Sequence, residues 1–372
     1  MSGGVDSSVA ACLLAERGFN IIGLFMRVGA DPVENEGADG GVDRSSRKQG
    51  CCSASDASDA RFVAGKLGVP FFALNFKREF DQLIDEFSDA YAAGRTPNPC
   101  VVCNQKFKFG RLMAYADAVG AEFVATGHYA RIQRNGAECR LARSADAQKD
   151  QTYVLFGLSP AVLPRVLFPL GDLTKADVRR EAHRFGLPNA DKPDSVEICF
   201  VPDQDYARVV RSRRPDAFRD GDVVDSNGQV VGRHRGLPRY TIGQRRGLGI
   251  AVGEPIYVTR LNVLDNTVTV GPRGHLLKRE LTVNGINLLR SDVGATFRAD
   301  VKIRYHHEPS PATVTMTDGI AQVVFDEPQS APTPGQAAVF YNDDVVVGGG
   351  WIDQVMDEPI ETSPALAAGC PV

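Results

Sequence analysis

The chain has 372 residues, of which 43% are hydrophobic and 24% charged, and its formal net charge is −4. Such a composition is typical of a globular protein with two or three domains of about 100–200 residues each. The negative charge disfavours nonspecific binding to nucleic acid. No apolar run approaches the roughly 20 residues of a membrane helix, and no export leader opens the sequence, so we expect a cytoplasmic protein.

The first 200 residues alternate helix-like and strand-like segments. Helices are predicted over residues 7–17 and 56–67, because each apolar run ends at a glycine. Strands are predicted over residues 20–26, in the run VPFFALNF and over residues 121–126. Strands that alternate with helices indicate an α/β fold with a doubly wound parallel sheet.

The pattern changes near residue 205. Residues 206–246 contain ten arginines and four aspartates, a local charge of +6 that leaves −10 on the remainder. A basic segment of this kind is either a contact surface for phosphates or an ordinary solvated face. From about residue 256, short alternating runs with a turn every 8–12 residues predict an antiparallel barrel or sandwich.

These changes of pattern predict three regions and a tail. The polar, glycine-rich stretch 29–50 is expected to be a mobile surface loop. The predicted division is a catalytic α/β domain over 1–204, a small basic linking domain over 205–277, a C-terminal antiparallel β-barrel over 278–358 and a disordered tail over 359–372.

A glycine-rich turn opens the first predicted helix. Two adjacent glycines in Ser2-Gly3-Gly4-Val5-Asp6-Ser7-Ser8 allow a ligand to approach the backbone closely, and the helix N-terminus offers unpaired amides and the positive end of its dipole. The turn lacks the lysine of the GxxxxGK[ST] loop. It predicts a site for pyrophosphate, and the plainer alternative is a glycine turn capped by Ser and Asp.

The motif SGGVDSS resembles that of the PP-loop ATP pyrophosphatases, which cleave ATP to AMP and pyrophosphate. Six further motifs occur in order: GLFM, AGRTPNPCVVCNQKFKFG, ATGHYA, KDQTYVL, EICF and YTIGQRRGLG. Together they are similar to the tRNA-specific 2-thiouridylases, from residue 1 to about 356 apart from the 29–50 loop. In that family a buried strand precedes the glycine turn, whereas this sequence starts at Met1 with the turn itself. The resemblance therefore implies either a start assigned downstream of the natural one or a central sheet one strand short.

The resemblance implies a sulfur-transfer reaction on two cysteines. ATP would adenylate O2 of the wobble uridine of a tRNA anticodon loop, and a persulfide on Cys199 would deliver sulfur to C2. Cys103 would be the paired catalytic thiol, leaving a transient Cys103–Cys199 disulfide, and a persulfide-carrying donor protein would supply the sulfur. Lys106 and Lys108 are candidates to make the surroundings of Cys103 electropositive.

Cys100 allows two metal-binding alternatives, because many relatives carry Asp at this position. An iron–sulfur cluster on Cys100, Cys103 and Cys199 would use thiolates as ligands. A zinc site on Cys51, Cys52, Cys100 and Cys103 is the weaker alternative, since adjacent cysteines make awkward tetrahedral ligands.

The family match also implies ligand contacts, some of which the isolated residue types would not predict. ATP phosphates would lie among residues Met1, Ser2, Gly3, Gly4, Val5, Asp6 and Ser7, with Mg²⁺ near Asp6, and adenosine would lie beside Met26 and Gly127. The target base and tRNA would contact Asn98, Pro99, Cys100, His128, Lys149, Asp150, Gln151, Arg304, Tyr305 and Gln336. We add Arg245 and Arg246 as candidate phosphate contacts from the basic segment.

Two other functions fit parts of the sequence. One is a different PP-loop enzyme, such as an amidating ligase or a tRNA-lysidine synthetase, which would need no persulfide on Cys199. The other is an RNA-binding protein with a degenerate loop, which would form no AMP from ATP and tRNA. The intact SGGVDSS motif disfavours the second.

Overall fold

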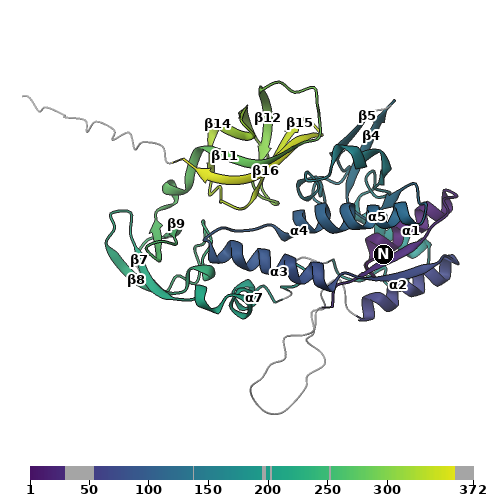
Figure 1. Ribbon diagram of the computed structural model, residues 1–372, viewed down its shortest axis with the longest axis horizontal. Coiled ribbons are helices and arrows are strands. Elements are labelled where there is room, and N and C mark those ends of the chain that lie inside the picture. The colour runs from purple at the N-terminus through teal and green to yellow at the C-terminus, as the bar shows by residue number, and fades with distance from the viewer. Residues whose placement is uncertain (30–53, 137, 195–197, 202, 251–252, 357–372) are drawn as a thin grey trace, which may run out of the picture.

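A computed structural model describes residues 1–29, 54–136, 138–194, 198–201, 203–250 and 253–356 (Figure 1). Most of the predicted 29–50 loop and of the 359–372 tail, together with Cys51 and Cys52, lie outside the described residues. Within the described part of the chain, no helix is both long and apolar enough to span a membrane.

The N-terminal region is an α/β unit, as predicted. Its parallel strands form two pairs, β1 (Gly23–Arg27) with β2 (Phe71–Asn75), and β3 (Val124–Ala125) with β6 (Val166–Leu167). Its helices are α1 (Val5–Glu16), α2 (Ala54–Leu67), α3 (Lys77–Ala92), α4 (Pro99–Val102), a π-helix (Cys103–Arg111), α5 (Leu112–Ala118) and α6 (Lys175–Arg184). Parallel strands between helices confirm the predicted fold class.

A β-hairpin leaves this unit and joins the C-terminal barrel. Its strands are β4 (Ala130–Asn135) and β5 (Glu138–Arg143), and Ala142 of β5 pairs with Val345 of the barrel. The alternating polar and apolar residues of β4 and β5 indicate strands but do not indicate which other strand they pair with. The hairpin therefore makes one continuous sheet of two regions that the sequence separates by 200 residues.

The middle region is a four-stranded sheet beside α7 (Tyr206–Arg213), seen at the lower left of Figure 1. Its strand order is β8-β7-β10-β9, with β7 (Asp220–Val224), β8 (Val230–Arg235), β9 (Tyr257–Asn262) and β10 (Thr267–Gly271). The first two alternating runs after residue 256 therefore belong to this sheet and not to the barrel. Short 3₁₀ turns occur at Thr152–Val154, Pro160–Arg165, Pro215–Ala217, Leu237–Arg239 and Arg273–Leu276.

The C-terminal region is a closed antiparallel barrel, as predicted. The strands follow the order β11-β14-β13-β12-β15-β16, and pairing between β11 and β16 closes the ring. They span β11 (Leu277–Leu288), β12 (Thr296–Lys302), β13 (Ser310–Thr317), β14 (Ile320–Ser330), β15 (Ala337–Asn342) and β16 (Val345–Val355). Alternate side chains fill the interior, including the fully buried Val301, Val323 and Phe340.

Candidate active site

The glycine turn is built so that its backbone, and not its side chains, faces a ligand. Gly3 has φ +74°, and a Cβ at this position would lie 2.2 Å from the carbonyl oxygen of Asp56 in α2. Gly4 is the N-cap of α1 and supplies no side-chain cap to the first turn. The Ser7 hydroxyl accepts a hydrogen bond from the Ser2 amide at 3.0 Å and fixes the turn. Uncapped amides at a helix N-terminus suit the anionic phosphates of ATP.

Gly127 lies directly against this turn. A Cβ on Gly127 would lie 2.7 Å from the carbonyl carbon of Asp6 and 2.8 Å from the amide nitrogen of Ser7. The end of β3 therefore approaches the first turn of α1 at backbone contact distance. The structure thus brings Gly127 to the residues with which the family match groups it.

The Asp6 carboxylate is held by two groups that sequence reasoning missed. The Tyr129 hydroxyl donates to Asp6 Oδ1 at 2.8 Å, and Lys175 Nζ of α6 lies 2.7 Å from the same oxygen. Oδ2 of Asp6 accepts no hydrogen bond from the described residues. An aspartate in the first turn of α1 with one oxygen not hydrogen-bonded fits a magnesium ion, which prefers carboxylate and phosphate oxygens.

A second lysine clamps the other side of the turn. Lys192 Nζ contacts the carbonyl oxygen of Gly3 at 3.2 Å, Asp56 at 2.7 Å and Asp59 at 2.8 Å. The Asn189 amide also donates to the Gly3 carbonyl oxygen at 3.0 Å. These contacts join the turn to α2 and to the chain 190 residues away, so the turn keeps its shape without a ligand.

The two candidate sulfur-carrying cysteines meet at one apolar cluster. Cys103 begins the π-helix Cys103–Arg111, and Cys199 lies in a turn in which the Val201 amide donates to the Ile198 carbonyl oxygen at 2.8 Å. Both side chains are half-buried against a cluster built from Val28, Phe76, Phe80, Leu83, Phe107 and Leu112. Met26, the predicted neighbour of adenosine, packs against the same cluster. A π-helical stretch often marks a functional site, and here it presents Cys103 at its first residue.

The lysines near Cys103 have partners of their own. Lys106 Nζ lies 2.8 Å from the exposed carboxylate of Glu86, so its charge is largely compensated there. Lys108 Nζ lies 3.5 Å from Nε2 of His128. The prediction that both lysines serve Cys103 therefore holds at most for Lys108, because the Glu86 carboxylate takes the Lys106 ammonium.

The structure does not support the iron–sulfur alternative. Cys100 is exposed, whereas Cys103 and Cys199 are half-buried. Among the described residues, no three His, Cys, Asp or Glu side chains form a group that fits a metal ion. Two of the four ligands of the weaker zinc alternative, Cys51 and Cys52, lie outside the described residues.

His128 is almost enclosed, with 7% of its surface exposed. Its Nδ1 lies 2.8 Å from the Thr126 hydroxyl, and its ring packs beside those of Phe109 and Phe168, with centroids 6.1 and 5.9 Å away. Burial, and then the positive charge of Lys108, hold the pKa of His128 well below its usual value. The ring is therefore neutral at neutral pH.

A pH-dependent stability follows from this burial. Because only the unfolded chain binds a proton on His128 as the pH falls through its ordinary pKa of about 6.5, the folded state loses stability below that pH. We expect His128→Asn to cost less free energy of unfolding at about pH 5.5 than at about pH 8. Urea unfolding of both proteins at the two pH values measures the difference, and an equal cost at both would contradict it.

The segment 149–151 is anchored on three sides. Lys149 Nζ lies 2.8 Å from Asp194, and the buried Asp150 carboxylate accepts from the Ser144 amide at 3.1 Å and the Thr152 hydroxyl at 2.6 Å. The Gln151 side chain accepts from the Tyr129 amide at 2.9 Å. The structure therefore turns the Asp150 carboxylate inward and leaves Lys149 at the surface.

The barrel residues of the predicted tRNA site lie against the TPNPC segment. Gln336 donates to the carbonyl oxygens of Thr96 at 3.0 Å and Pro97 at 3.3 Å. Asn98 caps α4 by accepting from the Val101 amide at 3.4 Å. Gln336 thus holds the segment that carries Asn98, Pro99 and Cys100, in addition to any contact it makes with RNA.

Tyr305 is a second barrel residue near that segment. Burial, and then the charges of Asp150 and Cys100, raise the pKa of Tyr305 to about 12. Its ring lies edge to face with that of Tyr153, with centroids 6.2 Å apart, and packs against the cluster that contains Val101 of α4. Arg304 precedes Tyr305 in the loop after β12. Gln336 and Tyr305 of the barrel therefore both lie beside the segment that leads into α4.

Comparisons with known proteins agree with this arrangement. Residues 1–203 match the family described as the tRNA methyl transferase HUP domain, residues 209–272 its PRC-barrel domain, and residues 278–352 the aminomethyltransferase beta-barrel domain. A tRNA-specific 2-thiouridylase MnmA of Geobacter metallireducens is 49% identical over 96% of each chain. That of Rhodopirellula baltica is 45% identical over 99% of this chain and 98% of its own.

The chain belongs to the tRNA-specific 2-thiouridylase family. The resemblance stated from the motifs is thereby confirmed over nearly the whole length of this chain and of its relatives.

Two arginines of the basic segment of this thiouridylase family member form a contact between domains. Arg213 and Arg214 at the end of α7 pair with Asp81, Asp85 and Asp89 of α3, at distances of 2.5–3.6 Å. Three aspartates at four-residue spacing form one acidic stripe on a helix. For these two arginines, neither sequence alternative for the +6 segment, a phosphate surface or a solvated face, describes the contact, which the acidic stripe on α3 indicates.

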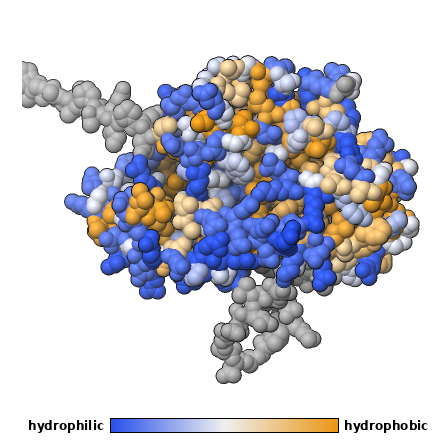
Figure 2. All heavy atoms as spheres, in the orientation of Figure 1, coloured by the Kyte–Doolittle hydropathy of each residue, from blue (hydrophilic) through white to orange (hydrophobic). Residues whose placement is uncertain are grey.

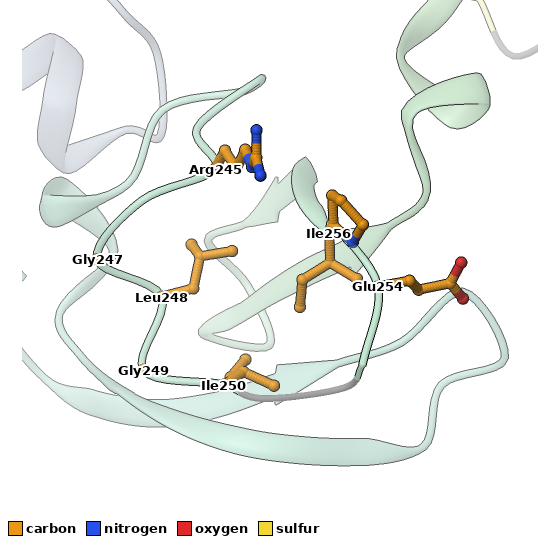
Figure 3. A pocket seen from close by; sticks show the side chains of 8 residues that line it. Arg245, Gly247, Leu248, Gly249, Ile250, Glu254 and Ile256 are labelled. Carbon is orange, nitrogen blue, oxygen red and sulfur yellow. The ribbon is translucent and has the colours of Figure 1, made fainter.

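Arg245 and Arg246 remain available to a ligand. Both are exposed in the loop before β9, and neither forms an ion pair within the described residues. Figure 3 shows Arg245 at the rim of a hollow of about 380 Å³ that Leu248, Ile250 and Ile256 line. Hydrophilic residues cover the neighbouring face over α3 and α7 (Figure 2).

Proposed function

We propose that this chain is a tRNA-uridine 2-sulfurtransferase that uses ATP to activate the wobble uridine. The observation that carries this proposal is the apolar cluster shared by Met26, Cys103 and Cys199. Met26 is the predicted neighbour of adenosine, and the two cysteines are the candidate thiols. In addition, Gly127 lies at backbone contact distance from the glycine turn. The relatives that match nearly the whole chain are named tRNA-specific 2-thiouridylases.

In the activation step, the uridine O2 attacks the α-phosphorus of ATP, and pyrophosphate leaves. The amides of residues 3–7 hold the departing phosphates, and Asp6 together with Lys175 sets the charge beside them. Mg²⁺, when bound through Asp6, neutralises the charge of the phosphates. The product is an adenylated base whose C2 carries a good leaving group.

In the transfer step, the terminal sulfur of a Cys199 persulfide forms a bond to C2, and AMP leaves with the former O2. Cys103 thiolate then attacks the Sγ of Cys199, which forms the Cys103–Cys199 disulfide and leaves the sulfur on the base. Alternatively, Cys103 attacks first and releases hydrosulfide, which displaces AMP. Either route oxidises the two thiols, and a dithiol reductant returns them to the starting state.

The remaining assignments complete the proposal. Residues 98–100, 128, 149–151, 304–305 and 336 contact the tRNA anticodon loop, and a cytoplasmic protein that carries a persulfide supplies the sulfur. The catalytic domain comprises residues 1–204, the linking domain 205–277 and the barrel 278–358, with a tail over 359–372. The contacts of Gln336 with Thr96 and Pro97, directly before Asn98, support a base pocket between the first and third domains.

The test is thiolation by the purified protein. The purified protein is first charged with a Cys199 persulfide by transfer of sulfane sulfur from a polysulfide, and excess polysulfide is removed. Unmodified tRNA, ATP and Mg²⁺ are then added for a single turnover, and the tRNA nucleosides are analysed by mass spectrometry. We expect 2-thiouridine at the wobble position with one AMP formed for each. An amidating or lysine-attaching PP-loop enzyme would form AMP without thiouridine, and an RNA-binding protein with a degenerate loop would form neither.

Arg245 and Arg246 give a quantitative test of the tRNA surface. Each arginine that neutralises a phosphate contributes about 0.7–0.9 to the slope of log affinity against log salt. We expect the double change to Gln to weaken tRNA binding and to make that slope shallower by about 1.5. Filter binding at several salt concentrations measures it.

The matched control for that pair is Arg298→Gln. Arg298 is an exposed barrel arginine already paired with Asp326 at 2.7 Å, so its loss should leave the slope unchanged. A slope that is identical in the wild type and in the Arg245 and Arg246 double variant would remove these arginines from the interface.

A further inference from the structure

One carboxylate connects the phosphate turn to the surface assigned to tRNA. Asp194 Oδ1 lies 2.8 Å from Lys175 Nζ, and Asp194 Oδ2 lies 2.8 Å from Lys149 Nζ. The same Lys175 ammonium lies 2.7 Å from Asp6 Oδ1 in the first turn of α1. A chain of ion pairs therefore runs from Lys149 through Asp194 and Lys175 to Asp6.

A second path joins the same two places. The Gln151 amide donates to the carbonyl oxygen of Tyr129 at 2.9 Å, and the Tyr129 amide donates to the Gln151 side chain at 2.9 Å. The Tyr129 hydroxyl donates to Asp6 Oδ1 at 2.8 Å. The two paths close a ring of contacts between the segment 149–151 and the phosphate turn.

The ring is partly shielded from solvent, so its ion pairs are stronger than exposed ones. The side chain of Lys175 is 13% exposed and that of Asp194 is 25% exposed. Although burial acts to raise it, hydrogen bonds from Lys149 and Lys175 hold the pKa of Asp194 below its usual value. Arg179 is a third cation at 3.3 Å from Asp194, which is therefore a carboxylate shared by three positive charges.

We propose that Asp194 is a positioning residue that couples tRNA binding to ATP binding. This inference rests on the proposed function, which assigns Lys149 to tRNA and Asp6 to the ATP site. A tRNA phosphate that pairs with Lys149 removes one cation from Asp194. Asp194 then attracts Lys175 more strongly, and Lys175 releases the Asp6 carboxylate toward the magnesium that accompanies ATP. Bound tRNA thus prepares the phosphate turn, and ATP is held most tightly when the substrate base is present.

The experiment measures this coupling by binding alone. The probe is α,β-methylene-ATP with Mg²⁺, because its bridge replaces the bond that adenylation breaks. Its dissociation constant is measured by calorimetry with and without saturating unmodified tRNA. We expect tRNA to tighten binding about tenfold in the wild type, within the usual range of coupling between two sites, and by less than about twofold in Asp194→Asn. The effect of the probe on tRNA affinity must show the same factors, because coupling is reciprocal.

Two further variants separate coupling from a general structural role. Asp191→Asn is the matched control, because Asp191 lies three residues away, is 84% exposed and pairs only with His183 among the described residues, so it should keep the wild-type factor. Tyr129→Phe removes the hydroxyl that donates to Asp6, and with it the second path, but keeps the aromatic side chain. We expect it to reduce the coupling factor even if Asp194→Asn proves too unstable to measure. Asp194→Glu should restore part of the coupling.

The outcomes distinguish this inference from the function on which it rests. If probe and tRNA both bind to the wild type but the factor is unchanged in Asp194→Asn or Tyr129→Phe, the coupling role is wrong and the proposed function stands. If tRNA leaves the affinity of the wild type for the probe unchanged, so that the coupling factor is near one, the coupling role is also overturned. If neither ligand binds to the wild type, the proposed function itself fails.

Discussion

Replacing Cys199 by Ser should abolish thiolation while leaving activation of the base intact. The hydroxyl cannot carry a persulfide, so sulfur has no route to C2, whereas the glycine turn and Asp6 that serve activation are untouched. Loss of the group that forms the covalent intermediate commonly lowers turnover by about 10³-fold or more. Single-turnover assays that follow 2-thiouridine and pyrophosphate separately would show pyrophosphate without thiouridine.

Cys139→Ser is the matched control for this prediction. Cys139 is a half-buried cysteine on β5, away from the cluster that holds Cys199, and its replacement should keep thiouridine formation near the wild-type rate. Cys103→Ser should lose thiouridine formation as Cys199→Ser does, because no second thiol is then present to resolve the persulfide. Thiouridine formation above about a tenth of the wild-type rate in Cys199→Ser would contradict the assigned role.

The second large effect is expected from Gly127→Ala. Its methyl group would lie 2.7 Å from the carbonyl carbon of Asp6 and 2.8 Å from the amide nitrogen of Ser7, and neither backbone group can give way without moving the first turn of α1. Overpacking of this kind costs about 1–3 kcal/mol, and if this cost falls on the ATP-binding conformation it lowers ATP affinity about fivefold to 150-fold. Calorimetric titration with α,β-methylene-ATP measures the loss.

Gly65→Ala is the matched control, because it makes the same glycine-to-alanine change at a position with free space around it. Gly65 lies in α2, and a Cβ there would have no neighbour within 4 Å, so alanine should stabilise the helix by about 0.5–1 kcal/mol and leave ATP affinity unchanged. Equal ATP affinities of Gly127→Ala and the wild type would show that the phosphates are bound elsewhere.

Features that depend on local sequence were predictable. The turn at Gly3 and Gly4 was recognised because only glycine takes φ +74° against a neighbouring backbone, and the barrel was recognised because its strands alternate with period two. The roles of Cys103 and Cys199 needed the family resemblance, since a cysteine's chemistry depends on surroundings that its own position does not encode.

Features that depend on long-range contacts were not predictable. Lys175, Lys192 and Asp194 reach the phosphate turn from about 170–190 residues away, and no periodicity marks a lysine that will meet a distant aspartate. The inward-facing Asp150 looked like a polar turn residue for the same reason. The acidic stripe on α3 is visible at four-residue spacing, but the charge of the basic segment alone does not indicate that Arg213 and Arg214 are its partners.

The central claim is that sulfur passes from a persulfide on Cys199 to an ATP-activated base inside one pocket. A direct test loads the purified protein with ³⁵S as a persulfide, removes excess sulfide, and adds unmodified tRNA with or without ATP and Mg²⁺. We predict that the label moves to the tRNA in one turnover only when ATP is present, with one AMP formed for each labelled thiouridine. Label that stays on the protein with ATP present, or that reaches tRNA without ATP, would contradict the claim.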